Sequence, residues 1–202
     1  MLTNKLLKDI YDFAKHAHIN QFRKDGITPF INHPLNVAEI LYFISDKNNI
    51  ELLAAALLHD IIEDTEYTTE TLQIKLNEFG NSNFVNKVMF YVTSMTNKYI
   101  KKSYPNLNRK QRKKLEFTIF KLWTDDNLKR LKLADIISNL RNFSDLEFNF
   151  AHTYIFEEFE LIRILKIDDI IWWTAVEEIT TQFKNLIIRY FIFIIIMFLA
   201  IN

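Results

Sequence analysis

The sequence of 202 residues contains no cysteine, only two glycines and only three prolines. The lack of cysteine excludes disulfide bonds and thiolate metal sites, and it is typical of proteins in a reducing compartment. Glycine and proline interrupt regular structure and form tight turns, so their scarcity favours long helices over a turn-rich sandwich or barrel. We therefore expect an all-α fold and a cytoplasmic location.

The formal net charge is zero, because 25 basic residues balance 25 acidic ones. Without a field of one sign around the molecule, the composition does not favour binding to nucleic acid or to anionic membranes. The first residues, Met1 to Lys5, contain no apolar core of a secretory signal peptide. Apolar residues make up 49% of the chain, which suffices for one buried core. We predict a single globular domain over residues 1–180 and an apolar helical tail over residues 181–202.

Apolar residues recur at helical spacing through most of the chain, which predicts a helical bundle. The predicted helices span residues 6–22, 34–43, 52–64, 70–79, 83–95, 109–123, 130–142, 151–165 and 169 onward. We expect the first helix to end near Gly26, because glycine is common at helix C-termini. The polar segment 97–108 should form a loop. His16 and His18 are interpreted as surface or packing residues, and Trp173 as a core residue.

The end of the chain is almost wholly apolar from Leu186 to Ile201 and is interrupted only by Arg189. At about 1.5 Å per residue, the unbroken part from Tyr190 onward is too short for a hydrocarbon core of ~30 Å, which needs about 20 residues. We favour a buried terminal helix over a contact between copies in a homo-oligomer, and that contact over membrane association. Replacement of a lost domain in a shortened reading frame also remains open.

Four ionisable residues interrupt the apolar helix predicted over 52–64. His59 and Glu63 are four residues apart, and so are Asp60 and Asp64, so each pair should share a helix face. Such groups are costly to bury alone, and they therefore pair, bind metal or change their pKa. The alternative is a helix end that leaves the core, where the carboxylates are simply solvated.

Two other positions place polar groups in apolar surroundings. His33 lies at a helix start directly before Pro34, and a residue before proline is held extended, so the backbone fixes its direction. Asp135 lies in the apolar helix predicted over 130–142 and shares a face with Asn139, four residues later. A buried carboxylate at this position needs a cation.

Together, these segments supply two imidazoles and two carboxylates from three separate helices: His33, His59, Asp60 and Asp135. Mixed nitrogen and oxygen ligands suit Mn²⁺, Fe²⁺ or Zn²⁺ better than Ca²⁺ or Mg²⁺. Four protein ligands leave coordination positions open, which is typical of a catalytic site. Such an ion would activate water and polarise a phosphoryl oxygen, and Glu63 and Asp64 could orient that water and move its proton.

Basic residues near these segments have ordinary explanations. Arg23 and Lys24 are cations near a predicted helix C-terminus, which the helix dipole favours. Their functional alternative is contact with an anion or a base beside the pocket. The basic run 109–114 is expected to be a solvated helix face, although beside a phosphorylated ligand it would raise the local anion concentration.

These motifs resemble the HD superfamily of metal-dependent phosphohydrolases and, more narrowly, the hydrolase domain of the RelA/SpoT family. The resemblance covers roughly residues 14–165 and involves several ordered motifs. They are Arg23-Lys24-Asp25-Gly26, Ile31-Asn32-His33-Pro34-Leu35, the segment from Ala54 to Thr65, and Lys132-Leu133-Ala134-Asp135 with Asn139 and Arg141.

The resemblance implies an all-helical HD-type domain that binds one Mn²⁺. It implies hydrolysis of the alarmone guanosine 3′,5′-bis(diphosphate), (p)ppGpp, at its 3′-diphosphate, which gives GDP or GTP and pyrophosphate. The metal ligands that it implies are His33, His59, Asp60 and Asp135, and the residues that activate water are Glu63 and Asp64. Around the guanine base it places Arg23 and Lys24, and it makes Asn139 a nucleotide contact.

Two positions depart from the family pattern. In the motif Asp-Arg-Leu-His-Asn, which begins with the last metal ligand, the family usually has Arg and His where this chain has Ile136 and Ser138. Hydrolysis of another nucleotide phosphate, or a degenerate domain that only binds nucleotide or a partner, therefore remains an alternative. We expect no synthetase domain after the hydrolase region, so the chain resembles a small single-domain alarmone hydrolase or a shortened piece of a longer enzyme.

Overall fold

The structure is a computed structural model that describes residues 1–45, 47–143 and 148–201. Within these ranges the chain is helical, and β structure is limited to an isolated bridge between Phe22 and Pro29. The helices are α1 (Lys5–Ala17), α2 (Asn32–Ile40), the π-helical turn η1 (Leu41–Ser45), α3 (Ile50–Leu58), α4 (Ile61–Asp64), α5 (Thr69–Leu76), α6 (Ser82–Met95), α7 (Arg109–Phe120), α8 (Asp126–Arg141), α9 (Phe148–Ile164) and α10 (Ile170–Ile201). The predicted all-α bundle is confirmed.

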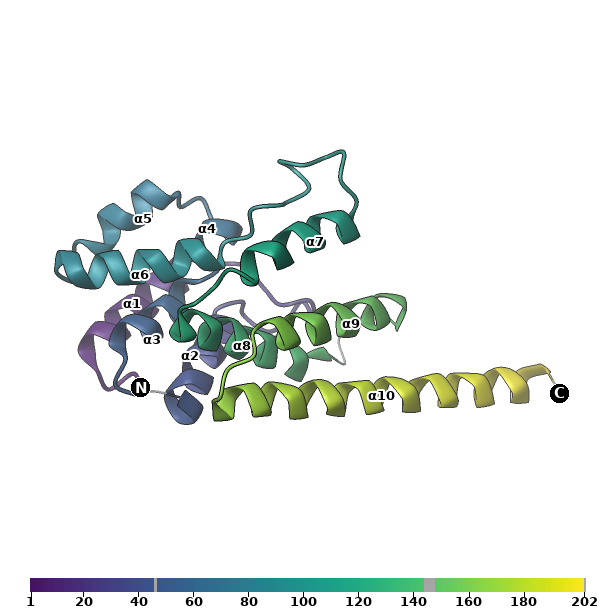
Figure 1. The fold of residues 1–202 in the computed structure, drawn as a ribbon. Coiled ribbons are helices and arrows are strands. Elements are labelled where there is room, and N and C mark those ends of the chain that lie inside the picture. The colour runs from purple at the N-terminus through teal and green to yellow at the C-terminus, as the bar shows by residue number, and fades with distance from the viewer. Residues whose placement is uncertain (46, 144–147, 202) are drawn as a thin grey trace.

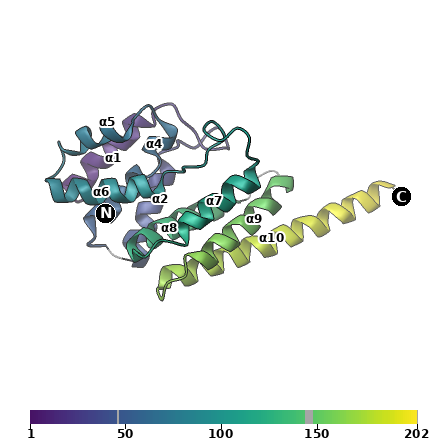
Figure 2. The ribbon, with the colours of Figure 1, turned by 45° about the horizontal axis from the view of Figure 1, so that its top comes forward.

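Two central helices organise the packing. α3 packs against α1, α2 and α6, while α8 packs against α2 and α10. Figure 1 shows α5 and α6 on one side of this centre and α9 and α10 on the other. Figure 2 shows α10 running alongside α9, and α10 also packs against α8. Every residue from Leu52 to Leu58 is buried, as expected for a helix that is apolar on all sides. Polar groups on α2, at the end of α3 and on α8 therefore meet inside the bundle.

The helix predicted over residues 52–64 is interrupted between α3 and α4, so this prediction is wrong. His59 and Asp60 form the turn between the two helices. The Nδ1 atom of His59 lies 2.8 Å from the carbonyl oxygen of Ala56. A side chain bonded to this carbonyl competes with the backbone N–H that would otherwise continue the helix. The side chains of His59 and Asp60 therefore project into the interior from a turn. They do not project from one face of a straight helix.

The first helix is also shorter than predicted, because it ends at Ala17 and not near Gly26. Asn20 has a φ of 63°, a left-handed conformation that a right-handed helix does not contain. The following chain pairs Phe22 with Pro29 as an antiparallel bridge. Gly26, with a φ of 71°, lies in the loop of this bridge. We call residues 22–29 the hairpin, and it carries Arg23 and Lys24 to the site.

α10 crosses the predicted domain boundary at residue 180 as one continuous helix, and the boundary itself stays a prediction. The far end of α10 extends beyond the other helices (Figures 1 and 2). Leu186 is buried, but Ile187 and Phe191 are 41% and 61% exposed, so the described side chains do not form a buried terminal helix. Trp173, predicted in the core, is 59% exposed, because it lies on the outer face of α10. As far as the structure describes them, the helices do not combine the length and apolar character needed to span a membrane.

Candidate active site

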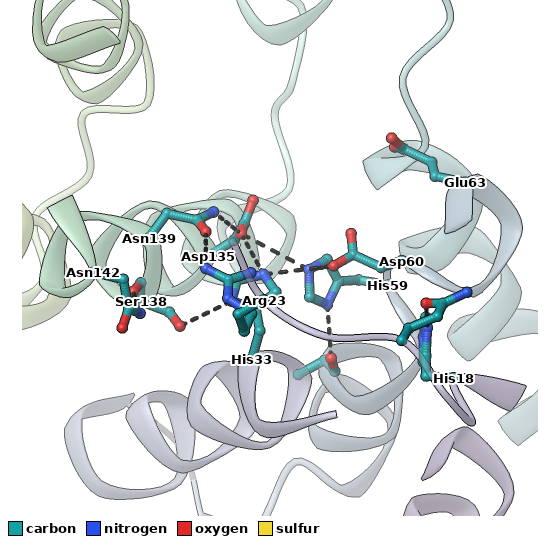
Figure 3. Close-up of polar contacts among 12 residues, drawn as sticks. His18, Arg23, His33, His59, Asp60, Glu63, Asp135, Ser138, Asn139 and Asn142 are labelled. Atoms are coloured by element: carbon teal, nitrogen blue, oxygen red, sulfur yellow. Dashed lines mark hydrogen bonds and ion pairs between the residues drawn. The ribbon is translucent and has the colours of Figure 1, made fainter. Parts of the chain in front are cut away.

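The predicted metal ligands meet where α2, the turn after α3, and α8 converge (Figure 3). The His59 Nε2 atom lies 3.1 Å from the Asp60 Oδ2 atom and 3.8 Å from the Asp135 Oδ1 atom. The His33 Nε2 atom lies 3.5 Å and 3.2 Å from the same two oxygens. Both imidazoles are buried. The structure thus brings together all the residues that were predicted as ligands, from distant parts of the chain.

Contacts on the opposite side of each ring orient the two imidazoles. The His59 Nδ1 atom contacts the carbonyl of Ala56 at 2.8 Å, and the His33 Nδ1 atom contacts the Ser138 Oγ atom at 3.0 Å. A carbonyl oxygen only accepts, so His59 carries a proton on Nδ1 and is left with a lone pair on Nε2 when neutral. Ser138 can accept from His33 in the same way. Nitrogen and oxygen lone pairs then face one another, an arrangement that needs a cation.

This donor set fits a divalent transition metal ion. The ligand atoms of His33, His59 and Asp60 all lie within 4.8 Å of one another. The buried Nε2 atom of His59 has no hydrogen-bond partner among the described residues, as expected of an atom directed at an ion. Mixed nitrogen and oxygen ligands suit Mn²⁺, Fe²⁺ or Zn²⁺. The residues that would hold the ion are these three together with Asp135.

Charges around the cluster keep its carboxylates ionised. Burial alone would raise the pKa of Asp135, but Lys132 and the two imidazoles hold it well below its usual range. The Lys132 Nζ atom donates to the Asp135 Oδ2 atom at 2.9 Å. Burial alone would lower the pKa of His59, but Asp60 and Asp135 raise it overall to about 9. In the absence of metal, a proton on His59 therefore balances part of the negative charge.

Hydrogen bonds connect Asp135, a predicted metal ligand, to the predicted nucleotide contacts. The Asn139 Nδ2 atom donates to the Asp135 Oδ1 atom at 2.8 Å, and an Arg23 guanidinium nitrogen donates to the Asn139 Oδ1 atom at 3.1 Å. Arg23 also lies over the ring of Phe30, 5.9 Å from its centroid. Asn139 therefore orients both a metal ligand and a hairpin arginine, in addition to lining the cavity.

Two adjoining cavities surround these groups. The central cavity, of about 270 Å³, contains the ligand cluster. A second cavity of about 270 Å³ shares Arg23, Asn139 and Tyr154 with the first. Lys24 lines only the second cavity, and its Nζ atom lies 5.2 Å from the centroid of the Phe150 ring. A ligand with a base and phosphates could therefore place one end in each cavity, as ligands commonly occupy concave sites of this scale.

Glu63 and Asp64 line the central cavity at the end of α4. The Glu63 carboxylate accepts hydrogen bonds from the backbone N–H and the side-chain amide of Asn97, at 2.6 Å and 2.8 Å. Figure 3 shows Glu63 apart from the ligand cluster. Partial burial of the carboxyl group, with the charges of Asp60 and Glu63, raises the pKa of Asp64 to about 6. A carboxyl group with such a pKa is suited to accept a proton and return it, and the catalytic role of Asp64 stays a prediction.

The cavity wall includes residues to which the sequence analysis assigned no role. Tyr154 and Glu158 lie four residues apart on α9 and both line the central cavity. Burial raises the pKa of Glu158, whose Oε2 atom has no hydrogen-bond partner among the described residues. Lys132 is three residues before Asp135, a helical spacing that could have suggested their pairing. For α9, nothing in the sequence indicates which face meets the cavity.

The basic run 109–114 is mainly a solvated face, as predicted. Arg109, Lys110 and Lys114 are exposed. Arg109 makes two hydrogen bonds to the Glu157 carboxylate. Lys113 differs, because it is half-buried and lines the central cavity, where it adds positive charge. The functional alternative for this run therefore applies to one residue of it.

Comparison with known protein families matches residues 11–154 to the HD domain. The guanosine-3′,5′-bis(diphosphate) 3′-pyrophosphohydrolase MESH1 of Mus musculus is 37% identical over 139 residues, which are 68% of this chain and 69% of that protein. The Homo sapiens protein of the same name is also 37% identical over 139 residues, with the same coverage. The bifunctional (p)ppGpp synthase/hydrolase SpoT of Escherichia coli is 32% identical over 142 residues, which are 70% of this chain and 18% of SpoT.

A solved structure shares the fold. It is described as that of a metazoan ortholog of SpoT that hydrolyzes ppGpp and plays a role in starvation responses. The TM-score is 0.70 at 25% identity, and the match covers 89% of this chain and 96% of the other. All the predicted site residues lie within the matched range 11–154. The chain therefore belongs to the HD-domain family of hydrolases and is a relative of proteins named guanosine-3′,5′-bis(diphosphate) 3′-pyrophosphohydrolases.

Proposed function

We propose that this protein is a Mn²⁺-dependent hydrolase that removes the 3′-diphosphate of (p)ppGpp and releases GDP or GTP and pyrophosphate. The main support is the convergence of His33, His59, Asp60 and Asp135 on one point beside a nucleotide-sized pair of cavities. The names of the relatives supply the substrate class. Manganese is chosen among the ions that fit because the RelA/SpoT resemblance implies it.

His33, His59, Asp60 and Asp135 would hold the divalent ion, which when bound would supply Lewis acidity that lowers the pKa of water and polarises a phosphoryl oxygen. Asp64 accepts the proton of the attacking water, because a carboxyl group with a pKa of about 6 is mostly ionised at pH 7. The water oxygen bonds to the phosphorus that is attached to the 3′ oxygen. The bond between this phosphorus and the 3′ oxygen breaks. Asp64 then returns the proton to the leaving 3′ oxygen. Glu63, held by Asn97, orients the water.

The substrate is oriented by the hairpin and by cationic side chains. Arg23 and Lys24 lie beside the second cavity and contact the guanine end, and Asn139 holds Arg23 in place. Lys113 and Lys132 line the central cavity and offset the negative charge of the phosphates. In this proposal, the scissile phosphorus lies near the ligand cluster.

The direct test is incubation of the purified protein with ppGpp and Mn²⁺. We expect pyrophosphate and GDP to form, and we expect chelation or the substitution Asp60→Ala to abolish this reaction. A matched control is Asp9→Ala, which removes an exposed carboxylate on α1 far from the site in sequence. Intact ppGpp in a reaction where a known hydrolase cleaves it would contradict the proposal.

Another nucleotide phosphate is the second candidate substrate, because two positions differ from the family pattern. Ile136 lines the central cavity, where it offers an apolar surface in place of an arginine. Ser138 contacts His33 and does not reach the cavity lining. A panel of nucleotides that differ in base and in 3′-phosphate separates the candidates. A degenerate, binding-only domain is less well supported, because the ligands and both acidic residues are present.

Location and partners belong to this proposal as well. A cytoplasmic location agrees with the lack of cysteine. We propose no nucleic acid partner, because the charge is balanced. The exposed apolar side chains of α10, such as Ile188 and Phe191, would suit a homo-oligomer, and membrane contact is the less favoured alternative. Light scattering and vesicle sedimentation distinguish the two.

A further inference from the structure

A glutamine outside the predicted site connects the end of α1 to Asp64. The Gln21 Nε2 atom donates to the backbone carbonyl oxygen of Asp64 at 2.6 Å. The Gln21 Oε1 atom contacts the His18 Nδ1 atom at 2.8 Å. Because the amide nitrogen faces a carbonyl, the amide oxygen faces His18 and must accept from it. The three residues therefore form one directed chain of hydrogen bonds.

His18 is fixed by its surroundings and is not a surface residue. Its side chain is buried, unlike that of His16, which is exposed. The imidazole lies against the ring of Phe30, with the ring centroids 4.8 Å apart. Burial lowers the pKa of His18, so the neutral ring with a proton on Nδ1 is the form that donates to Gln21. Figure 3 shows His18 at the opposite end of the site from Asn139.

Asp64 needs an external partner because α4 is short. The helix spans only Ile61–Asp64, and the last carbonyls of a helix have no partner within it. The bond from Gln21 satisfies the carbonyl of Asp64 and fixes the backbone from which its carboxylate projects. The Asp64 residue is exposed overall and its carboxyl group is only partly buried, so packing does little to hold it.

Gln21 also lies at the base of the hairpin. Its backbone carbonyl accepts a hydrogen bond from the N–H of Phe30 at 2.9 Å. Inside the hairpin, the N–H of Arg23 donates to the carbonyl of Thr28 at 2.8 Å. One residue thus holds both the segment that carries Arg23 and the turn that carries Asp64. Gln21 does not line either cavity of the site, so it acts on substrate only through its neighbours.

We propose that Gln21, oriented by His18, is a positioning residue that holds Asp64 in its place for water activation. This inference rests on the proposed function, in which Asp64 moves the proton. A small displacement of a reacting group lowers the rate of the chemical step more than it lowers substrate binding. The loss of the bond should therefore reduce kcat and leave KM, metal affinity and thermal stability nearly unchanged.

The first experiment compares Gln21→Leu and Gln21→Glu with the wild type. Neither variant can donate to the Asp64 carbonyl, and the second is nearly isosteric, so it guards against a folding defect. We expect kcat to fall by about tenfold or more, while KM changes by less than about twofold. Gln73→Leu, at an exposed position on α5, is the matched control and should leave kcat unchanged.

Variants of His18 test whether it orients the amide. His18→Leu removes the donor and should lower kcat in the same way as Gln21→Leu. His18→Asn places an amide nitrogen near the position of Nδ1 and should restore most of the activity. Equal losses in both His18 variants would show that packing against Phe30 matters and the hydrogen bond does not, which would overturn this part of the inference.

A double-mutant cycle with Asp64→Asn decides the mechanism. If Gln21 acts through Asp64, Gln21→Leu should change the residual kcat of Asp64→Asn by less than about twofold. An equal loss in both backgrounds, or an unchanged kcat in the single variant, would overturn the inference while leaving the proposed function intact. A wild type that does not cleave (p)ppGpp would instead refute the proposed function, and this inference with it.

Discussion

The ligand cluster and the end of α4 lie beside the same cavity but are held in opposite ways. In the cluster, His33 and His59 are buried, and each is oriented by a contact on its far nitrogen. At the end of α4, Glu63 and Asp64 are exposed. Beyond the backbone hydrogen bonds of α4 itself, they are held by hydrogen bonds from Asn97 to the Glu63 carboxylate and from Gln21 to the Asp64 carbonyl oxygen.

This difference suggests a division of work. The proposed metal ligands are fixed by burial and by mutual charge, so they should keep their geometry when a single contact around them is lost. The acidic residues are held by few contacts in a short helix, so they should respond to small changes. Substitutions in the two regions should therefore affect different measured quantities: metal affinity and stability for the cluster, and kcat for the end of α4.

The largest effect is expected for Asp135→Ala. This substitution removes a proposed metal ligand and leaves the buried Lys132 ammonium without its partner. Removing one partner of a buried ion pair costs about 3–5 kcal/mol, so denaturant unfolding in the presence of a chelator should show a loss of this order. Adding the substitution Lys132→Met to the Asp135→Ala variant should restore much of the lost free energy of unfolding. An unchanged unfolding midpoint for Asp135→Ala would contradict the buried-pair account.

Asp64→Asn should lower kcat by about 10²–10³-fold, because it removes the proposed proton acceptor. Metal affinity should remain that of the wild type, since Asp64 is not in the cluster. For the wild type, kcat should rise with pH through about 6, as Asp64 loses its proton. Steady-state kinetics at pH values between about 5 and 8, a range that includes this pKa, measures the effect. A variant with full activity would remove Asp64 from the mechanism.

Ser138→Ala should weaken metal binding by about 10–100-fold, because His33 loses the contact that orients its ring. Ser138→Thr keeps the hydroxyl group and should bind metal more like the wild type. Titration calorimetry with Mn²⁺ measures the affinity without reference to activity. Equal affinities for the alanine variant and the wild type would show that burial alone orients His33.

The smallest effect concerns stability at the end of α4. The folded state raises the pKa of Asp64 to about 6 from its usual 3.8, so its ionised form is less favourable in the folded protein than in the unfolded chain. This cost is absent below the unfolded value and is complete above the folded value. Asp64→Asn should therefore stabilise the protein at pH 8 by about 1 kcal/mol at most, because exposure screens the charge, and not at pH 3. Thermal unfolding at the two pH values tests the sign.

The residues that converge in the ligand cluster could be predicted from the sequence, because polar residues are unusual within apolar stretches. His59 and Asp60 follow an unbroken apolar run, and Asp135 lies within another. The break between α3 and α4 could not be predicted from the sequence. The hydrogen bond from His59 to the Ala56 carbonyl replaces a backbone hydrogen bond, and no glycine or proline marks the position. For the same reason the hairpin was not predicted, because the first helix ends at Ala17 without a glycine or proline there, and Asn20 with its positive φ follows.

The residues around the ligand cluster to which the sequence assigned no role are placed by tertiary packing. Tyr154 and Glu158 line the cavity because of the way α9 packs against α7 and α10, and the sequence pattern of α9 does not indicate that orientation. Gln21 belongs to a polar segment that resembled a helix end, and its partner Asp64 is 43 residues away. Residues whose role is set by distant contacts are therefore the ones that local patterns leave unassigned.

The central claim is that four side chains hold one divalent ion, and Mn²⁺ binding tests it most directly. Protein freed of metal by a chelator and titrated with Mn²⁺ should bind one ion per chain, as a single site with these ligands requires. Asp60→Ala should bind it far more weakly, while the helical circular dichroism signal stays the same. A wild type that binds no Mn²⁺, Fe²⁺ or Zn²⁺, or that binds as well after the loss of Asp60, would contradict the account.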